Sequence, residues 1–156
     1  TVFHLAAIHG GRGYVDLHQA LCSRNLAMDG MVFKTSYEAG VEITFHQPPA
    51  ITISVDRDRL ILILFSLVHN AVQHTRAGGE VVLALTQESE RVVICVSDNG
   101  IGIPAEYQER IFDPFFKVPG SDSPDTERGG LGLACARLNA ILLEALLKVR
   151  STPGQG

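Results

Sequence analysis

The feature that most constrains this chain is the stretch DRDRLILILFSLVHNAVQHT, which runs from residue 56 to residue 75. Residues 61–68 are apolar on nearly every side of a helix, so such a helix has to be covered by other parts of the chain. Asp56, just before the apolar run, is a candidate N-cap. The stretch therefore predicts a helix buried in a layered domain. Its apolar positions recur at helical spacing, at Leu60, Leu64, Leu67 and Ala71.

A polar stripe interrupts this helix. Ser66, Asn70, Gln73 and His74 lie three and four residues apart, which places them on one side of the helix. Buried polar side chains cost free energy unless they find partners. Either protein groups satisfy them, or the stripe faces a polar ligand. Because an amide oxygen is a ligand that Mg²⁺ accepts, Asn70 is a candidate metal ligand, with a purely structural role as the alternative.

A second unusual segment is VSDNGIGIP, at residues 96–104, directly after an apolar strand-like run. Asp98 stands at the end of that run, where a carboxylate needs a donor such as the exocyclic amine of adenine. Gly100 and Gly102 lack a Cβ and would let a flat ring approach the backbone. Asp-Asn-Gly is also a common hairpin turn. Here Ile-Pro and a polar helix follow instead of an alternating strand, which favours a binding loop.

Two further motifs lie towards the end of the chain. GGLGLA, at residues 129–134, opens a helix after a loop rich in Gly, Pro, Ser and Asp at 118–130. Backbone N–H groups at a helix start attract anions, and glycines let a phosphate come close. IFDPFFKV, at residues 111–118, places three phenylalanines around Asp113 and Pro114. Such a cluster belongs either to the core or to a hydrophobic hinge that seats a mobile lid.

Composition limits the class of protein. The 156 residues, 46% hydrophobic and 19% charged, describe one ordinary globular domain. A net charge of −4 argues against a nucleic-acid partner. The apolar run 60–68 is shorter than the roughly 20 residues that cross a bilayer. We therefore expect a cytoplasmic domain without membrane contact, although its parent could be membrane-anchored. We expect buried free thiols at Cys22, Cys95 and Cys135.

The order of elements predicts an α/β (α+β) two-layer sandwich, with a mixed, mostly antiparallel sheet covered on one face by helices. Two strand pairs are expected, one as a hairpin within 41–55 and the other from 80–87 and 91–98. A last strand is expected near 147–151. Helices are expected at 1–10, 18–36, 57–75, 105–111 and 131–147.

The order and spacing of these motifs resemble the ATP-binding catalytic domain of sensor histidine kinases, which belongs to the Bergerat superfamily of gyrases, heat-shock chaperones, histidine kinases and mismatch-repair proteins. The resemblance covers nearly the whole chain and implies the Bergerat ATP-binding fold. LVHNAVQHT looks like the N-box of that family, DNGIGIP like its first glycine box, IFDPFFK like its F-box and GGLGLA like its second glycine box.

The resemblance implies roles for individual residues. Asn70 would hold Mg²⁺ against the triphosphate, and Asp98 would bind the adenine amine, with Gly100 and Gly102 under the ring. Lys117 would meet phosphate at the start of an ATP lid at 118–128. His69 could contact the proton in transfer, or be an ordinary exposed polar residue. The other residues placed around the nucleotide are Gln73, His74, Ile103, Phe112, Arg128, Gly130, Leu131, Gly132 and Leu133.

The resemblance also implies a domain organisation. Residues 1–13 look like the tail of the second dimerisation helix and a linker, and residues 14–156 like the catalytic domain without the family's usual final strand. None of the six histidines is followed by an acidic residue, as the family's phosphate acceptor usually is. The acceptor is therefore expected on an upstream dimerisation domain. The implied partners are ATP, Mg²⁺, that domain and a response-regulator receiver domain, and the isolated domain is expected to be a monomer.

The sequence departs from the family pattern at several positions. The N-box usually carries a second Asn where Ser66 stands and a Lys where Gln73 stands, and Glu127 and Arg128 replace leading glycines of the second glycine box. An ATPase of the gyrase branch needs a carboxylate one helical turn before Asn70 to activate water. Because Ser66 occupies that place, we expect a protein-histidine kinase that transfers the γ-phosphoryl group. The alternatives are a catalytically weak nucleotide-binding signalling module, an ATPase of the superfamily, and a purely structural domain.

Overall fold

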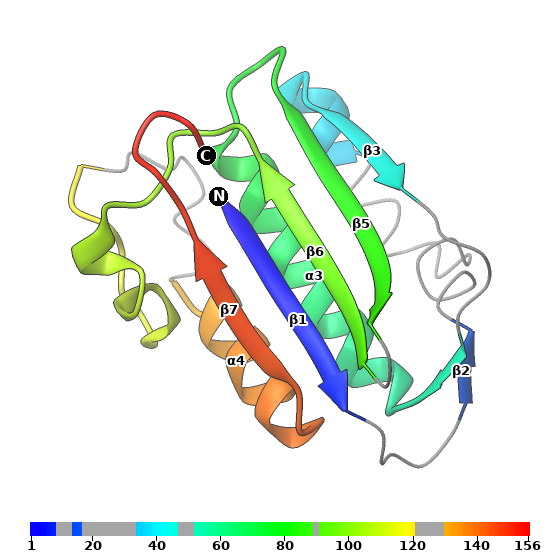
Figure 1. Cartoon of the computed structure of the whole chain (residues 1–156). Coiled ribbons are helices and arrows are strands. Elements are labelled where there is room, and N and C mark those ends of the chain that lie inside the picture. Colours follow the sequence, from blue (N-terminus) through cyan, green and yellow to red (C-terminus); the bar gives the residue numbers. More distant parts are fainter. Residues whose placement is uncertain (9–13, 17–33, 47–51, 89–90, 121–129) are drawn as a thin grey trace.

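The computed structural model describes residues 1–8, 14–16, 34–46, 52–88, 91–120 and 130–156. Its centre is a five-stranded sheet in the order β3-β5-β6-β1-β7 (Figure 1). Only β3 and β5 are parallel, and every other neighbouring pair in this sheet is antiparallel. The strands are β3 (Glu42–His46), β5 (Glu80–Glu88), β6 (Arg91–Asp98), β1 (Val2–Ile8) and β7 (Leu146–Arg150).

Two helices, α3 (Arg57–His74) and α4 (Gly132–Leu142), lie side by side behind one face of this sheet (Figure 1). A small separate sheet pairs β2 (Tyr14–Asp16) with β4 (Thr52–Ser54). The arrangement confirms the predicted two-layer fold with a mixed, mostly antiparallel sheet. Alternate residues of β5 and β6 point into the core between sheet and helices, namely Val81, Leu83, Leu85, Val92, Ile94 and Val96.

The predicted buried helix is confirmed as α3. Its first turn is capped as expected, because the Asp56 carboxylate accepts hydrogen bonds from the backbone nitrogens of Asp58 and Arg59, each at 3.1 Å. The apolar positions repeat at helical spacing on the side that faces the sheet and α4. The buried residues of α3 are Leu60, Ile63, Leu64, Leu67, Val68, Ala71 and Val72.

The helix predicted for residues 1–10 is wrong, because residues 2–8 form β1 in the interior of the sheet. Phe3 lies opposite Val96 of β6 on one side and Val149 of β7 on the other. The reason is long-range. As a strand, residues 2–8 satisfy their own backbone groups and also those of β6 and β7, whereas a helix would satisfy only its own backbone groups. Residues 2–8 are therefore part of the same sheet as β5 and β6, not the tail of a dimerisation helix.

The family's usual final strand is predicted from the sequence to be missing, and β1 lies next to β7 in the sheet. No strand follows β7 within residues 130–156, where a turn leads to the last residue. β1 lies next to β7 instead, so the sheet is continuous at this position. The two ends of the chain lie side by side (Figure 1). A Cβ built on Gly156 would stand 2.6 Å from the Thr1 backbone nitrogen.

Other boundaries differ from prediction. β3 and β4 do not form a hairpin, because β3 pairs in parallel with β5 and β4 pairs with β2. The helix predicted to reach residue 147 stops at Leu142, since Glu144 adopts a φ of 54° that no α-helix accepts. The short helix predicted at 105–111 consists of two 3₁₀ turns, η1 (Ala105–Tyr107) and η2 (Arg110–Phe112). Of the helix predicted at 18–36, residues 17–33 lie outside the described residues, and residues 34–39 are helical.

Two expectations from composition have different outcomes. None of the helices in the described ranges combines the length and the apolar character that a membrane span requires. The expectation of buried thiols is wrong for Cys135, which is exposed on α4, while Cys95 is partly buried and free. Burial raises the pKa of the Cys95 thiol. Cys22 lies outside the described residues.

Candidate functional site

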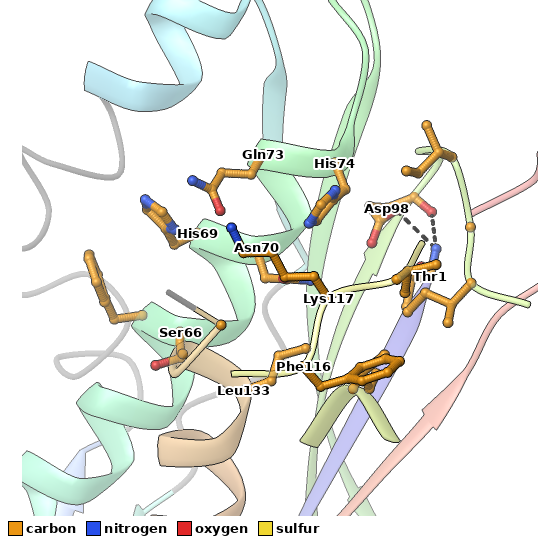
Figure 2. A pocket seen from close by; sticks show the side chains of 18 residues that line it. Thr1, Ser66, His69, Asn70, Gln73, His74, Asp98, Phe116, Lys117 and Leu133 are labelled. Carbon is orange, nitrogen blue, oxygen red and sulfur yellow. Dashed lines mark hydrogen bonds and ion pairs between the residues drawn. The ribbon is translucent and has the colours of Figure 1, made fainter. Parts of the chain in front are cut away.

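A cavity of about 180 Å³ lies between the C-terminal half of α3, the loop after β6 and the start of α4 (Figure 2). Since each water occupies about 30 Å³ in the liquid, the cavity is large enough for a small molecule or a group of several waters. Its lining residues are Thr1, Phe65, Ser66, His69, Asn70, Gln73, His74, Asp98, Ile101, Gly102, Ile103, Ile111, Phe116, Lys117, Val118, Gly130, Gly132 and Leu133.

The polar stripe of α3 forms one wall of this cavity. Ser66, Asn70, Gln73 and His74 all line it, as their spacing on the helix predicts, and His69 lines it as well (Figure 2). Asn70 is partly buried, and its amide has no hydrogen-bond partner among the described residues. The Ser66 hydroxyl is engaged, because it donates to the Leu62 carbonyl oxygen at 2.9 Å. The Asn70 amide is therefore available to a ligand in the cavity.

Asp98 lies beside the C-terminal end of this stripe, at the end of β6, with a side chain that is only 2% exposed (Figure 2). One carboxylate oxygen, Oδ1, accepts a hydrogen bond from the Gly100 backbone nitrogen at 3.0 Å. The Thr1 backbone nitrogen lies 3.0 Å from the same oxygen and 2.9 Å from the Asp98 carbonyl oxygen (Figure 2). The second oxygen, Oδ2, has no partner among the described residues. Asp98 thus combines a fixed orientation with one acceptor left for a ligand.

His74 lies near Asp98 in the same wall (Figure 2). Burial lowers the pKa of His74, and the nearby Asp98 carboxylate offsets part of that shift by raising it. A histidine with a lowered pKa is neutral at neutral pH. A neutral ring presents an apolar face and one free acceptor to the cavity, and it adds no positive charge beside Asp98.

The structure corrects the reason for the two glycines of the loop. A Cβ on Gly100 would stand 2.3 Å from the His74 carbonyl oxygen, and one on Gly102 would stand 2.2 Å from the Thr152 carbonyl oxygen. Both glycines therefore let the loop pack against protein backbone, and the approach of a ring to them stays a prediction. The Ile101 nitrogen also donates to the His74 carbonyl oxygen at 3.1 Å, which satisfies an orphan group at the end of α3.

The third wall comes from residues 116–118 and from the start of α4. Lys117 is exposed at the rim, and Phe116 packs beneath the Arg110 guanidinium, which lies 4.3 Å from the ring centroid. Gly132 and Leu133 begin α4, whose first backbone N–H groups carry partial positive charge. No atom lies within 4 Å of a Cβ on Gly132, so this glycine leaves open space.

The structure does not bring every predicted residue to the cavity. Phe112 is a core residue, edge-on to Phe3 with ring centroids 6.4 Å apart. Leu131 is 40% exposed at the N-cap of α4. Gly100 lies behind the cavity wall rather than in it. Arg128 and most of the predicted lid at 118–128 lie outside the described residues.

Sequence reasoning missed several lining residues. Phe116 and Val118 belong to the aromatic motif at 111–118. That motif stands shortly before GGLGLA in the sequence, which could have indicated that these two residues line the same site. Thr1 gave no local signal, because it reaches the cavity only through the pairing of β1 with β6. The other missed residues are Phe65, Ile101 and Ile111.

The chain is similar to a known protein family and to several sensor proteins. Residues 55–156 match the family model described as histidine kinase-, DNA gyrase B- and HSP90-like ATPase. The chain is 38% identical over 101 residues to the sensor histidine kinase RppB of Synechocystis sp., covering 65% of this chain and 22% of RppB. It is 37% identical over 106 residues to the alginate biosynthesis sensor protein KinB of Pseudomonas aeruginosa, covering 67% of this chain and 17% of KinB. It therefore spans about a fifth of the length of these curated relatives.

Among solved structures, full-length ShkA in complex with AMPPNP is similar, with a TM-score of 0.73 and 28% sequence identity. The match covers 96% of this chain and 30% of the ShkA chain. The likeness thus extends over nearly the whole chain.

Proposed function

The chain belongs to the family of histidine kinase-, DNA gyrase B- and HSP90-like ATPases, and from this membership we propose that it is the ATP-binding catalytic domain of a sensor histidine kinase. It would bind Mg-ATP and transfer the γ-phosphoryl group to a histidine on another domain. The observation that carries the proposal is the cavity, which is lined both by the oriented Asp98 carboxylate and by the Asn70 amide, for which the described residues supply no hydrogen-bond partner.

The Asp98 end suits a purine base with an exocyclic amine. Oδ1 is occupied by the Gly100 nitrogen, which leaves Oδ2 as an acceptor for an N–H donor. The surroundings are apolar, with Ile101 and Ile103 lining the cavity beside the carboxylate. A flat ring with one donor edge gains both contacts there, because apolar burial and a satisfied hydrogen bond add. Guanine carries a carbonyl oxygen where adenine carries its exocyclic amine. A guanine base would therefore place one acceptor against another at Asp98 and form no hydrogen bond there.

The opposite end suits Mg²⁺ and phosphates. The Asn70 amide oxygen is the type of hard ligand that Mg²⁺ accepts, together with phosphate oxygens and waters. No cluster of three or more acidic, histidine or cysteine side chains that could hold a metal occurs in the described part of the chain. A single amide ligand therefore fits a metal that arrives with its nucleotide. When bound, the metal would neutralise charge on the transferred phosphoryl group.

The chain's own residues supply position and charge around the phosphates. Lys117 lies at the cavity rim as a cation, and the first backbone N–H groups of α4, at Gly132 and Leu133, attract phosphate oxygens. His69 lines the cavity one residue before Asn70 and stacks on Phe65, with ring centroids 5.6 Å apart. We assign His69 a contact with the proton of the incoming nucleophile, which its ring nitrogens suit.

The absence of a second carboxylate favours transfer over hydrolysis. Asp98 is the one acidic residue among the described lining residues, and it belongs to the base end of the cavity. Ser66, one helical turn before Asn70, donates its proton to a backbone carbonyl and is no general base. A nucleophile therefore has to be brought by the acceptor. This favours a kinase over an ATPase of the gyrase branch.

The partners of the proposal lie beyond this domain. The named relatives are sensor proteins of which this chain spans about a fifth. The acceptor histidine would lie on an upstream dimerisation domain, and a response-regulator receiver domain would take the phosphoryl group from it. ShkA was solved with the ATP analogue AMPPNP, which supports the same ligand class for this chain.

Calorimetric titration with ATP, ADP and GTP, each with and without Mg²⁺, tests the proposal. We expect adenine-selective binding that Mg²⁺ strengthens for ATP. The absence of ATP binding by the folded chain would overturn the proposal.

A catalytically weak nucleotide-binding module is the second candidate. It is favoured by Gln73, which lines the cavity in place of a cation. The two candidates differ in one result, because only a kinase labels an added upstream dimerisation domain with the γ-phosphoryl group of ATP.

A further inference from the structure

The loop that carries Asp98 rests on a residue outside the cavity lining. Ser151 follows β7, and its hydroxyl oxygen accepts a hydrogen bond of 2.7 Å from the Ile103 backbone nitrogen. The same oxygen lies 3.0 Å from the Thr1 hydroxyl. One hydroxyl accepts from Ile103 and still has its proton for Thr1, so both contacts exist together.

These two contacts close a ring of interactions around the loop. Thr1 contacts Asp98 through its backbone nitrogen at 3.0 Å from Oδ1, while the Asp98 nitrogen donates to the Thr1 carbonyl oxygen at 2.8 Å. Ile103 is a cavity-lining residue five positions further along the loop. Ser151 thus links Thr1, which contacts the Asp98 carboxylate, to the backbone of Ile103 at the other end of the loop.

Neighbouring groups strengthen the attachment at the same place. The Gln108 side-chain nitrogen donates to the Ile103 carbonyl oxygen at 3.0 Å and to the Ser151 carbonyl oxygen at 2.8 Å. The Gly154 nitrogen donates to the Ile101 carbonyl oxygen at 2.8 Å. The turn after β7 therefore holds the part of the loop from Ile101 to Ile103, in addition to the hydrogen bond that the Gly100 nitrogen donates to Asp98 and the one that the Ile101 nitrogen donates to His74.

We propose that Ser151 is a positioning residue for the base end of the cavity, which sets the distance between the Asp98 carboxylate and the apolar wall at Ile103. The proposal rests on the proposed nucleotide function. It predicts that Ser151 affects recognition of the base and leaves the phosphate end unchanged, because Asn70 and Lys117 belong to other elements.

Three variants of the 156-residue chain test this. Ser151→Ala removes the oxygen, Ser151→Thr keeps it, and Thr152→Ala is the matched control, because no hydrogen bond of the Thr152 side chain occurs among the described residues. The measurements are calorimetric affinity for adenosine and for ATP with and without Mg²⁺, amide hydrogen exchange of Ile103, and thermal unfolding.

For Ser151→Ala we expect faster exchange of the Ile103 amide and an affinity for adenosine and ATP that is about tenfold weaker, because the base then has to order a loop that lacks one hydrogen bond. The factor by which Mg²⁺ strengthens ATP binding stays unchanged. Ser151→Thr restores affinity and exchange, and Thr152→Ala matches the unaltered chain in both. A merely structural role would lower the unfolding temperature without a selective loss at the base end.

The outcomes separate the two proposals. Should the unaltered chain bind no nucleotide, the proposed function is overturned, and the positioning role with it. If the unaltered chain binds ATP and Ser151→Ala binds adenosine equally well, only the positioning role is overturned. A loss of the Mg²⁺ effect in Ser151→Ala would also contradict it, because the phosphate end would then depend on the same residue.

Discussion

Gly102 lies directly against Thr152: a Cβ on Gly102 would stand 2.2 Å from the Thr152 carbonyl oxygen, and the φ angle of Gly102 is 73°. Two costs therefore meet at this position. A side chain is strained at a positive φ, and it also collides with backbone that has little room to move.

Gly102→Ala should lower the free energy of unfolding by about 2 kcal/mol or more, since a left-handed L-residue alone costs about 1 to 2 kcal/mol. For a domain of this size the unfolding temperature should fall by about 5 °C. Calorimetric unfolding measures both. Gly78→Ala is the control, because Gly78 has a φ of 81° with nothing within 4 Å of its Cβ position. Equal losses in the two variants would show that the contact with Thr152 is irrelevant.

Local patterns were enough to predict most of the fold. The apolar spacing of α3 and the capping residue Asp56 are properties of adjacent residues, and both appear in the structure. The strand pair β5 and β6 was predictable for the same reason, because the alternation of apolar residues along each strand is local. The polar stripe predicted the cavity wall, since residues at helical spacing share a side wherever the helix lies.

What could not be predicted depends on distant partners. The apolar residues of 1–10 fit a helix and a strand equally well, and the choice is made by β6 and β7, about 90 and 145 residues away along the chain. The same holds for β3, whose partner β5 lies beyond α3. Thr1 reaches the cavity, and Ser151 reaches the loop beside the cavity, only through such pairings, so no motif marks them.

Asp98→Asn should abolish the discrimination between ATP and GTP. The amide retains an oxygen for the Gly100 nitrogen, so the loop keeps its shape, but it presents an N–H₂ donor where the carboxylate offered an acceptor. We expect at least tenfold weaker ATP binding, because a donor of the base is left unpaired. Calorimetric titration with ATP and GTP measures this. Asp113→Asn, an exposed carboxylate, is the control, and unchanged ATP affinity in Asp98→Asn would contradict the assignment of the base end.

Asn70→Ala should remove the effect of Mg²⁺ on ATP binding and leave the fold intact. The Asn70 amide has no hydrogen-bond partner among the described residues, so its removal breaks no hydrogen bond within that part of the chain. The unfolding temperature should change by no more than about 2 °C, as for ordinary partly exposed substitutions. Ser66→Ala, which removes a hydroxyl from the same wall, serves as the comparison. A full Mg²⁺ effect in Asn70→Ala would rule out its metal role.

His74 should make stability depend on pH below neutrality. Burial lowers its pKa in the folded chain beneath the ordinary value near 6.5 of the unfolded chain. Between these two values the unfolded chain binds more protons, so stability is complete above about pH 6.5 and falls as the pH drops towards the folded pKa. Urea unfolding from pH 8 to pH 5 measures this dependence. His74→Gln should show a shallower decline than the unaltered chain, and an identical slope would contradict the assignment.

The position of β1 leads to a prediction about chain connectivity. A Cβ on Gly156 would lie 2.6 Å from the Thr1 nitrogen, so a peptide bond between the two residues needs only a local adjustment. A variant in which Gly156 is joined to Thr1, and the chain is opened within 9–13, should fold with the same sheet order and the same nucleotide affinity. Circular dichroism, thermal unfolding and calorimetry compare it with the unaltered chain.

The control is deletion of residues 1–8, which removes β1 from between β6 and β7 and strips both strands of hydrogen-bond partners. That deletion should abolish cooperative unfolding, while the rejoined chain retains it. If the rejoined chain fails to fold, the covalent link between β1 and β2 is itself required for folding. The place of β1 in the sheet would then not be sufficient. If it folds and binds, the sheet needs β1 only as a neighbour of β6 and β7, whichever end of the chain supplies it.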